Sequence, residues 1–597
     1  MLDARKLTAA AAALIVAQTI VRAWLVLRGD FYGDDLILIG QASTHDILSW
    51  DFLGVSDDGH LMPAAYLLGG ISTVIAPVQW WLPAVTLVVL QLIAALAVWR
   101  AIRIIAPDAR GGALISFAFY LFVPMTVTSY VWWSTGLSTL PFQAALAYVV
   151  GTAVVLVRDR PTGARATRLT IGAAGAFAAG LLFFEKSFVI APVAFVVAVL
   201  AARASSDGSP IAAAFGRARW LWAAMGALVV AWGGVFAATA SFGDGHSMSQ
   251  TVRLVWRTVN NGIVPSFTGG PWLWDRWAPS APTGSTPIWM IVLGWLILVT
   301  LVVLTVRARR GVVAVWAFVA VYAVGVQFPT MWLRSGAFTS LELAQTLQHL
   351  PDTALVLALG FALIAAAPSS GGTHAVKVAP DRRLAVAAVA ASAVFVLSSM
   401  VGTASFSQSW RDDPTGAYLA NARQAMADNA GHVMFDQQLP IEVLLPVAYP
   451  DNQLSHVFGR LRDRPDFGVV TDRLVVLDST GRAVPGGVTR ARTIAESRGT
   501  CRAPGIGGPQ VLRLDGPLFD IMWTVQLGYC ANIDGQIELG LDGGEPVRVD
   551  VEAGLHVVYV RVDGGGRGLH IRPVTPGLRL HTGEGRVGLA VVAGLAP

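Results

Sequence analysis

About eleven apolar runs before residue 405 restrict what this chain of 597 residues can fold into. Each run approaches the roughly 20 residues that an α-helix needs to cross a hydrocarbon core about 30 Å thick. Because backbone groups inside a bilayer have no water to bond, such runs are predicted to be transmembrane helices. Their approximate positions are 7–28, 79–101, 111–130, 138–157, 169–184, 187–203, 220–240, 287–307, 312–330, 352–368 and 384–404.

Composition agrees with a membrane-embedded chain. Hydrophobic residues make up 54% of the sequence and charged residues only 14%, unlike a soluble globular protein of this size. The formal net charge of +5 could indicate a nucleic-acid partner, but the arginines lie in short clusters between the apolar runs. Such clusters are typical of signals that orient membrane proteins. We therefore expect membrane lipids as partners and no nucleic acid.

The basic clusters also predict the orientation of the helices. A further apolar run, 61–77, is interpreted as a helix lying in the outer interface, because a crossing there would place Arg100, Arg103 and Arg110 outside. With that choice the clusters fall on one side, which the positive-inside rule makes cytoplasmic. We expect a multi-pass plasma-membrane protein with a cytoplasmic N-terminus and a retained first helix. The opposite loops hold only Arg28, Lys186, Arg253, Arg257, Arg276 and Arg334.

The composition and residue pattern of the sequence change after the last apolar run. We expect a transmembrane domain over 1–404, a helical connector over 405–434 and an extracytoplasmic β-sandwich over 435–597. In the last part short β-branched runs alternate with Gly and Asp turns, as in Leu555–Gly564. That alternation favours an antiparallel sandwich.

Two cysteines and two aromatic residues stand out in the C-terminal part. Cys501 and Cys530 are the only cysteines. In an exported domain they are expected to form a disulfide, with two unpaired thiols as the alternative. Trp523 lies in an apolar run and is interpreted as a core residue, although it and Tyr529 could instead offer stacking faces to sugar rings.

Two adjacent carboxylates follow the first apolar run. The segment Phe31-Tyr-Gly-Asp-Asp-Leu36 places Asp34 and Asp35 just beyond the membrane. An unpaired carboxylate is costly to desolvate there and needs a reason. One explanation is that an Asp caps the helix beginning at Leu36. The other is chemistry in which one Asp accepts a proton while its neighbour orients the acceptor or raises the pKa of the base.

With these residues the chain resembles the GT-C glycosyltransferases, polytopic enzymes that transfer sugars from polyprenyl-phosphate donors on the outer face of the membrane. The resemblance lies in Asp34-Asp35 after the first span, His60-Leu-Met-Pro63 opening the interfacial helix, and Trp99-Arg-Ala-Ile-Arg103 ending the second span. It covers the order of elements over roughly the first 200 residues. It implies an α-helical polytopic GT-C-like fold with about eleven transmembrane helices.

The resemblance also implies an activity. The chain would move a sugar from a polyprenyl-phosphate-linked donor to a cell-envelope glycan or glycolipid acceptor. Asp34 and Asp35 would be catalytic, with Asp35 preferred as the base for the acceptor hydroxyl. The C-terminal sandwich is similar in texture and position to carbohydrate-binding modules that some actinobacterial arabinosyltransferases carry outside the membrane.

A departing phosphate needs cations or hydrogen-bond donors. The outer loops offer Lys186, Arg334 and His349 for the donor phosphate, and His60 and Glu185 for substrate binding. The alternative for Glu185 and Lys186 is a solvated turn, and for Arg334 a snorkelling interfacial anchor. No His or Cys metal spacing and no nucleotide loop occurs in the sequence, so a divalent cation is the one cofactor considered.

Other features of the outer face stay open to two interpretations. Its many tryptophans are either interfacial anchors or stacking partners for sugars. The long Pro- and Gly-rich loop 241–286 is expected to shape an entrance for lipid or acceptor. Arg22, inside the first run, either faces the interior of the bundle or snorkels. The competing functions are a transporter or flippase of a lipid-linked precursor and a noncatalytic glycan-binding scaffold.

Overall fold

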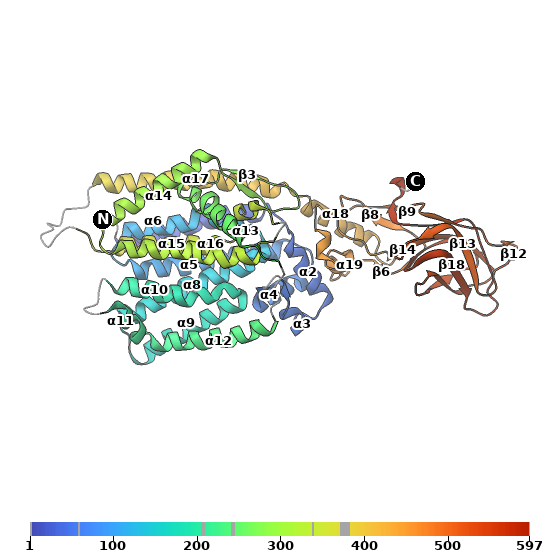
Figure 1. The fold of residues 1–597 in the computed structure, drawn as a ribbon, viewed down its shortest axis with the longest axis horizontal. Helices are drawn as coiled ribbons and strands as arrows, with labels where there is room; N and C mark the ends of the chain where they lie inside the picture. The colour runs from blue at the N-terminus through green and yellow to red at the C-terminus, as the bar shows by residue number, and fades with distance from the viewer. Residues whose placement is uncertain are drawn as a thin grey trace. The chain divides into compact units, whose positions relative to one another are not determined.

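A computed structural model of the chain describes residues 3–57, 60–203, 209–239, 245–336, 339–370 and 382–595. It divides the chain into two compact units, Met1–Asp413 and Pro414–Pro597. The first is a helical bundle and the second is rich in β-strands (Figure 1). The last long helix of the bundle, α17 (Arg382–Arg411), continues beyond residue 404, where the transmembrane domain was expected to end.

All eleven predicted runs lie in helices. Nine helical segments of the described residues are long and apolar enough to cross a membrane. The protein therefore has the architecture of a multi-pass membrane protein. The nine segments are α1 (Ala4–Val26), α5 (Trp81–Ile105), α8 (Trp133–Arg158), α9 (Gly163–Phe183), η2 (Glu185–Val189) with α10 (Ile190–Ala202), α12 (Arg219–Thr239), α14 (Ile288–Ala308), α15 (Val312–Leu333), and Val386–Asp428, which contains most of α17 and all of α18 (Thr415–Asp428).

The remaining two runs depart from the simple expectation of eleven straight spans. α6 (Arg110–Phe122) and the segment Pro124–Val131 form a pair bent by 49°, because Pro124 cannot continue the hydrogen-bond ladder of the helix. α16 (Pro351–Ala366) has 16 residues and is almost entirely buried within the bundle. At 1.5 Å per residue it is about 24 Å long, shorter than a typical hydrocarbon core.

The run that was interpreted as interfacial forms a short hairpin and a short helix. β1 (Ser56–Asp57) pairs with β2 (His60–Leu61), and α4 (Pro63–Ile75) follows with 13 residues. A helix of that size is about 20 Å long, too short to cross the membrane. This length supports the prediction that the segment does not span the bilayer.

The short helices that follow the first span lie at one end of the helical unit. α2 (Asp34–Thr44), α3 (Trp50–Leu53) and α4 lie there, and α11 (Pro210–Arg217) lies at the other end (Figure 1). α2 packs closely on α4, since a Cβ at Gly69 would meet the side chain of Leu38. α8 runs through the middle of the bundle, with 83% of its apolar stretch buried against other helices.

The second unit contains a ten-stranded antiparallel sheet folded around one apolar core. Along the sheet the order is β16, β15, β18, β13, β10, β20, β14, β17 and β7, with β19 paired to β14. β14 (Trp523–Ala531) and β17 (Gly554–Val562) pair along nine residues. The bounds of the other strands are β7 Val470–Thr471, β10 Arg492–Ile494, β13 Gln510–Leu518, β15 Gly535–Asp542, β16 Val547–Val551, β18 Gly565–Pro573, β19 Leu580–Thr582 and β20 Gly585–Gly588.

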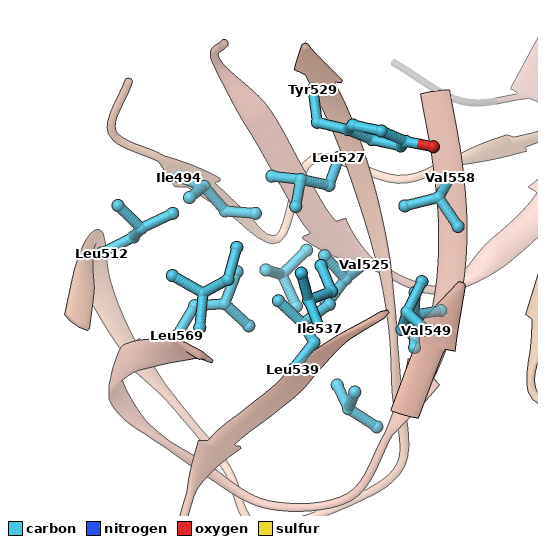
Figure 2. Close-up of a cluster of buried hydrophobic side chains, with 14 of the residues drawn as sticks. Ile494, Leu512, Val525, Leu527, Tyr529, Ile537, Leu539, Val549, Val558 and Leu569 are labelled. Atoms are coloured by element: carbon cyan, nitrogen blue, oxygen red, sulfur yellow. The ribbon is translucent and has the colours of Figure 1, made fainter. Parts of the chain in front are cut away.

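Alternation of apolar residues explains this core. Val558 and Val560 on β17 point inward at every second position, as the pleat requires, and Figure 2 shows Val558 among the clustered side chains of neighbouring strands. Trp523 belongs to the same core and donates its indole N–H to the Phe519 carbonyl at 2.9 Å. Tyr529 is only 4% exposed. Neither ring offers an open stacking face to a sugar.

Cys501 and Cys530 form a disulfide across a sequence separation of 29 residues. This is the pairing predicted from the sequence. A covalent link of that span restricts the unfolded chain, and the chain-entropy account assigns it about 3–4 kcal/mol.

Reduction of this bond should therefore destabilise the β-rich unit selectively. Mild reductant, or the pair Cys501→Ser and Cys530→Ser, is expected to lower the midpoint of its thermal unfolding by several degrees while the helical unit is unaffected. Differential scanning calorimetry on the full chain measures the unfolding midpoints, and thiol labelling of the denatured nonreduced protein measures whether the cysteines are paired. Two reactive thiols in nonreduced protein, or an unchanged midpoint after reduction, would contradict the prediction.

Candidate functional site

The two adjacent carboxylates begin α2 and have opposite environments. Asp35 is fully buried, whereas Asp34 is exposed. One oxygen of Asp35 accepts a hydrogen bond from the backbone N–H of Ser134 at 2.7 Å, and the other accepts from the N–H of Tyr32 at 3.0 Å. Asp35 thus ties the start of α2 to the first turn of α8. The residue before the pair, Gly33, has a φ of +51°, which glycine adopts without strain.

These two environments favour Asp34 as the general base, whereas the sequence led to a preference for Asp35. Burial raises the pKa of Asp35 to about 7, although the N–H groups of Ser134 and Tyr32 act in the opposite direction. A pKa near neutrality would suit a general base. However, both oxygens of Asp35 are engaged by backbone and its side chain is 0% exposed, so an acceptor hydroxyl has no access to it. Asp34 is the carboxylate of the pair that an acceptor could reach.

The raised pKa of Asp35 predicts a pH-dependent stability. A carboxyl whose folded pKa lies above its ordinary value of 3.8 contributes stability that is complete below about pH 4 and lost as the pH rises through 7. We expect the melting temperature of detergent-solubilised protein to fall between pH 5 and pH 8. The slope is at most about 1.4 kcal/mol per pH unit.

Variants separate this effect from other titrations. Asp35→Asn should melt at a lower temperature throughout, because its amide N–H faces a backbone N–H, and should lack this part of the slope. Asp34→Asn should keep it. Tryptophan fluorescence measures the melting temperature at each pH. If the melting temperature changes equally with pH in the parent and in Asp35→Asn, the pH dependence belongs to other groups.

A second group of predicted residues forms a hydrogen-bonded chain. His60 Nδ1 lies 2.6 Å from Glu185 Oε1, and His60 Nε2 lies 2.8 Å from Arg334 Nη2. Since the guanidinium can only donate, His60 Nε2 must accept, and the neutral tautomer with the proton on Nδ1 satisfies both contacts. β2, η2 and the C-terminal end of α15 supply these three side chains. Residues separated by up to 274 positions in sequence therefore meet at one point.

Lys186, beside Glu185, forms an ion pair with Asp352. Lys186 Nζ lies 2.9 Å from Asp352 Oδ2, with the two side chains 12% and 3% exposed. The same carboxylate oxygen accepts a hydrogen bond from the Tyr322 hydroxyl at 2.6 Å. Glu185 and Lys186 are therefore bound into the fold, which argues against a freely solvated turn.

His349 lies next to both groups. Desolvation lowers its pKa well below the ordinary value, and the charges of Arg334, Lys186 and His60 act in the same direction. His349 is consequently neutral near pH 7, and Gln348 Nε2 lies 3.2 Å from its Nε2. Its expected role as a phosphate ligand is thereby restricted to hydrogen bonding without a positive charge.

Sequence reasoning missed Asp352 and Tyr322. Asp352 follows Pro351 in the first turn of α16, a position where an acidic residue is ordinarily explained by the helix dipole. Tyr322 lies inside the apolar run of α15, where hydropathy gives no sign of a polar partner. Only the packing of α15 against α16 brings the phenol and the carboxylate together.

The loop expected to shape an entrance contains an ordered hairpin. β3 (Leu273–Asp275) pairs with β4 (Thr283–Ser285). Residues 241–244 of this loop lie outside the described residues. Arg276 forms an ion pair with Asp413 and lies over the Tyr32 ring at 5.2 Å from its centroid, while the Tyr32 hydroxyl donates to the Pro279 carbonyl at 2.7 Å. The hairpin is thus held against the segment that precedes the acidic pair.

Most tryptophans of this face are used in packing. Trp272 and Trp274 donate their indole N–H groups to Ser398 Oγ and the Gly402 carbonyl of α17, at 2.8 and 3.1 Å. Trp277, in contrast, is 84% exposed. It is the one of these three that could meet a ligand or a membrane surface directly.

Arg22 faces the interior of the bundle. Its side chain is 2% exposed, its Nη2 donates to the Leu121 carbonyl at 3.1 Å, and the guanidinium lies 3.3 Å from the centroid of the Tyr130 ring. Of the two interpretations of this residue, the structure shows the interior one.

The described residues contain no group of three His, Cys, Asp or Glu side chains that could hold a metal ion. The divalent cation considered from the sequence has no fitting ligand set among them.

Comparison with known proteins gives distant likenesses only. No family model and no curated protein matches the sequence. Among solved structures, the arabinofuranosyltransferase AftD from mycobacteria is similar over 99% of this chain, with 11% identity and a TM-score of 0.37. This chain covers 60% of the AftD chain. The Archaeoglobus fulgidus oligosaccharyltransferase is similar over 66% of this chain and 53% of its own, with 15% identity and a TM-score of 0.31.

Proposed function

We propose that this protein is a membrane glycosyltransferase of the GT-C type. It moves a sugar from a polyprenyl-phosphate donor to a cell-envelope glycan or glycolipid acceptor on the outer face of the plasma membrane. The observation that carries the proposal is the meeting of His60, Glu185 and Arg334, with Lys186 and His349 beside them. The network lies at the same end of the bundle as the start of α2, where Asp34 is exposed.

The exposed carboxylate supplies the proton acceptor. Asp34 accepts the proton of an acceptor hydroxyl as the hydroxyl oxygen bonds to the anomeric carbon of the donor sugar. The bond between that carbon and the phosphate oxygen breaks, and its electron pair leaves with the polyprenyl phosphate. A phosphate leaves as an anion, so no second carboxylic acid is required. Asp35 positions Asp34 through its bonds to Ser134 and Tyr32.

The basic network supports the departing phosphate. Arg334 uses one N–H for His60 and keeps further donors of its planar fork, and Lys186 keeps N–H donors beyond its contact with Asp352. His60 and His349 are neutral in this arrangement, so the binding of an anion depends on Arg334 and Lys186.

The full chain, reconstituted in lipid vesicles, tests this proposal against its competitors. A panel of radiolabelled polyprenyl-phosphate sugars is offered with envelope glycan fragments, and both the labelled glycan and the released polyprenyl phosphate are measured. We expect at least one donor to give both products in equal amounts. Translocation of an intact donor across the vesicle without product would favour a transporter, and glycan binding without either event would favour a scaffold.

A further inference from the structure

A cavity lies at the end of the bundle opposite to the proposed active site. Its volume is about 620 Å³. The ends of α5, α8, α10, α14 and α16 and the starts of α6 and α15 surround it. Four arginines and one aspartate line it, namely Arg158, Arg203, Arg309, Arg310 and Asp108.

Two of these arginines are used by the fold. Arg158 donates to the Ile104 carbonyl at 2.6 Å and to Asp159 at 2.9 Å, and Arg309 donates to the Ala367 carbonyl at 2.7 Å. They satisfy carbonyls at or beyond helix ends, a common role for arginines at that position. Arg203 and Arg310 are exposed, and their guanidinium groups have no hydrogen-bond or ion-pair partner among the described residues, although the backbone N–H of each donates to a carbonyl.

The electrostatic balance favours an anion in the cavity. Each helix terminus contributes about half a charge, negative at a C-terminus and positive at an N-terminus. Five ends and two starts therefore contribute about −1.5 charges. The lining side chains carry a surplus of three positive formal charges, which exceeds that contribution. The cavity is thus positive overall, even after the helix ends are counted.

The walls of the cavity indicate what kind of anion fits. Ile105, Leu200, Val315 and Leu363 line the cavity together with the arginines. A small inorganic anion gains nothing from apolar walls, whereas an amphiphile buries its hydrocarbon there and places its head group among the cations. The cavity also lies where the membrane-spanning helices end, at the depth of lipid head groups.

We propose that this cavity binds the phosphate head group of an anionic phospholipid, with Arg203 and Arg310 as its principal ligands. The site is separate from the proposed transferase centre and does not depend on that function. The bound lipid would add a contact between the end of α10 and the start of α15, and it makes the stability of the bundle sensitive to the charge of the surrounding lipids.

Native mass spectrometry of the full chain in detergent micelles tests the site. The probes are phosphatidylglycerol and phosphatidylcholine of equal chain length, with inorganic phosphate as competitor. We expect one phosphatidylglycerol to bind more tightly than phosphatidylcholine. The double variant Arg203→Ala/Arg310→Ala should weaken its binding about 30-fold, because each basic residue near a membrane surface contributes about 1 kcal/mol and 1.4 kcal/mol corresponds to tenfold.

A matched control decides whether phosphatidylglycerol binding depends on the cavity or on the general positive charge of this end of the bundle. Arg165→Ala/Arg307→Ala removes two exposed arginines from the same end that do not line the cavity, and it should change binding by less than about threefold. Ala366→Trp fills the cavity while it keeps every charge and should also weaken phosphatidylglycerol binding. Equal losses in the two double variants, unchanged binding in Ala366→Trp, or displacement of the lipid by equimolar inorganic phosphate would each overturn the proposal.

Discussion

Asp34→Asn is expected to lower the rate of sugar transfer by about 100- to 10,000-fold, the usual cost of removing a general base. The substitution keeps the size of the side chain and removes only its ability to accept a proton. Because Asp34 is exposed at the first turn of α2, the loss in stability should stay near 1 kcal/mol or below. Initial rates with a saturating polyprenyl-phosphate sugar measure the effect.

Asp35→Asn is the matched control, since it makes the same chemical change one residue further along. It should lower the melting temperature, because Asp35 bonds Ser134 and Tyr32 from a fully buried position. The rate per folded protein should fall less than in Asp34→Asn, because Asp35 positions the base and does not itself accept the proton. A variant Asp34→Asn that transfers sugar as fast as the parent, or an Asp35→Asn protein that is stable yet inactive, would show that the base has been assigned to the wrong residue.

Arg334→Ala is expected to lower kcat/KM for the donor by about 100- to 1,000-fold, the range found when one donor to a developing anion is removed. Arg334 is the cation that contacts His60, so its removal also leaves His60 Nε2 without its donor. Arg334→Lys keeps the charge but loses the planar fork, and it should recover only part of the activity. Donor titrations at fixed acceptor concentration give kcat and KM separately.

Arg253→Ala serves as the control for charge alone. Arg253 is exposed on α13 (Met248–Arg257), which packs against the same end of α15 through Leu254 and Met331. The substitution Arg253→Ala removes one positive charge from the same face and leaves the hydrogen bonds of His60, Glu185 and Arg334 in place. If Arg253→Ala and Arg334→Ala lower kcat/KM equally, the effect is a general attraction of the anionic donor, and the specific role of Arg334 is rejected.

Much of the helical architecture is readable from local sequence. Hydropathy depends on consecutive residues, so each of the eleven apolar runs was found where a helix lies. Hydropathy alone overestimated the number of straight membrane spans. The bend at Pro124 and the shortness of α16 depend on where prolines interrupt an apolar run. The disulfide needed no geometry, since only two cysteines exist.

Local sequence is enough to single out the polar residues that need a partner, because charge beside a membrane-spanning run is costly to leave unpaired. The identity of each partner depends on how distant segments pack together. Nothing local distinguishes Asp34 from Asp35, and the difference arises because the N–H of Ser134, 99 residues away, meets one of them. The contact of Arg334 with His60 depends likewise on α15 ending beside β2, and that of Asp352 with Tyr322 on α16 packing against α15. Burial and pairing are properties of packed helices, so they could not be read from any single segment.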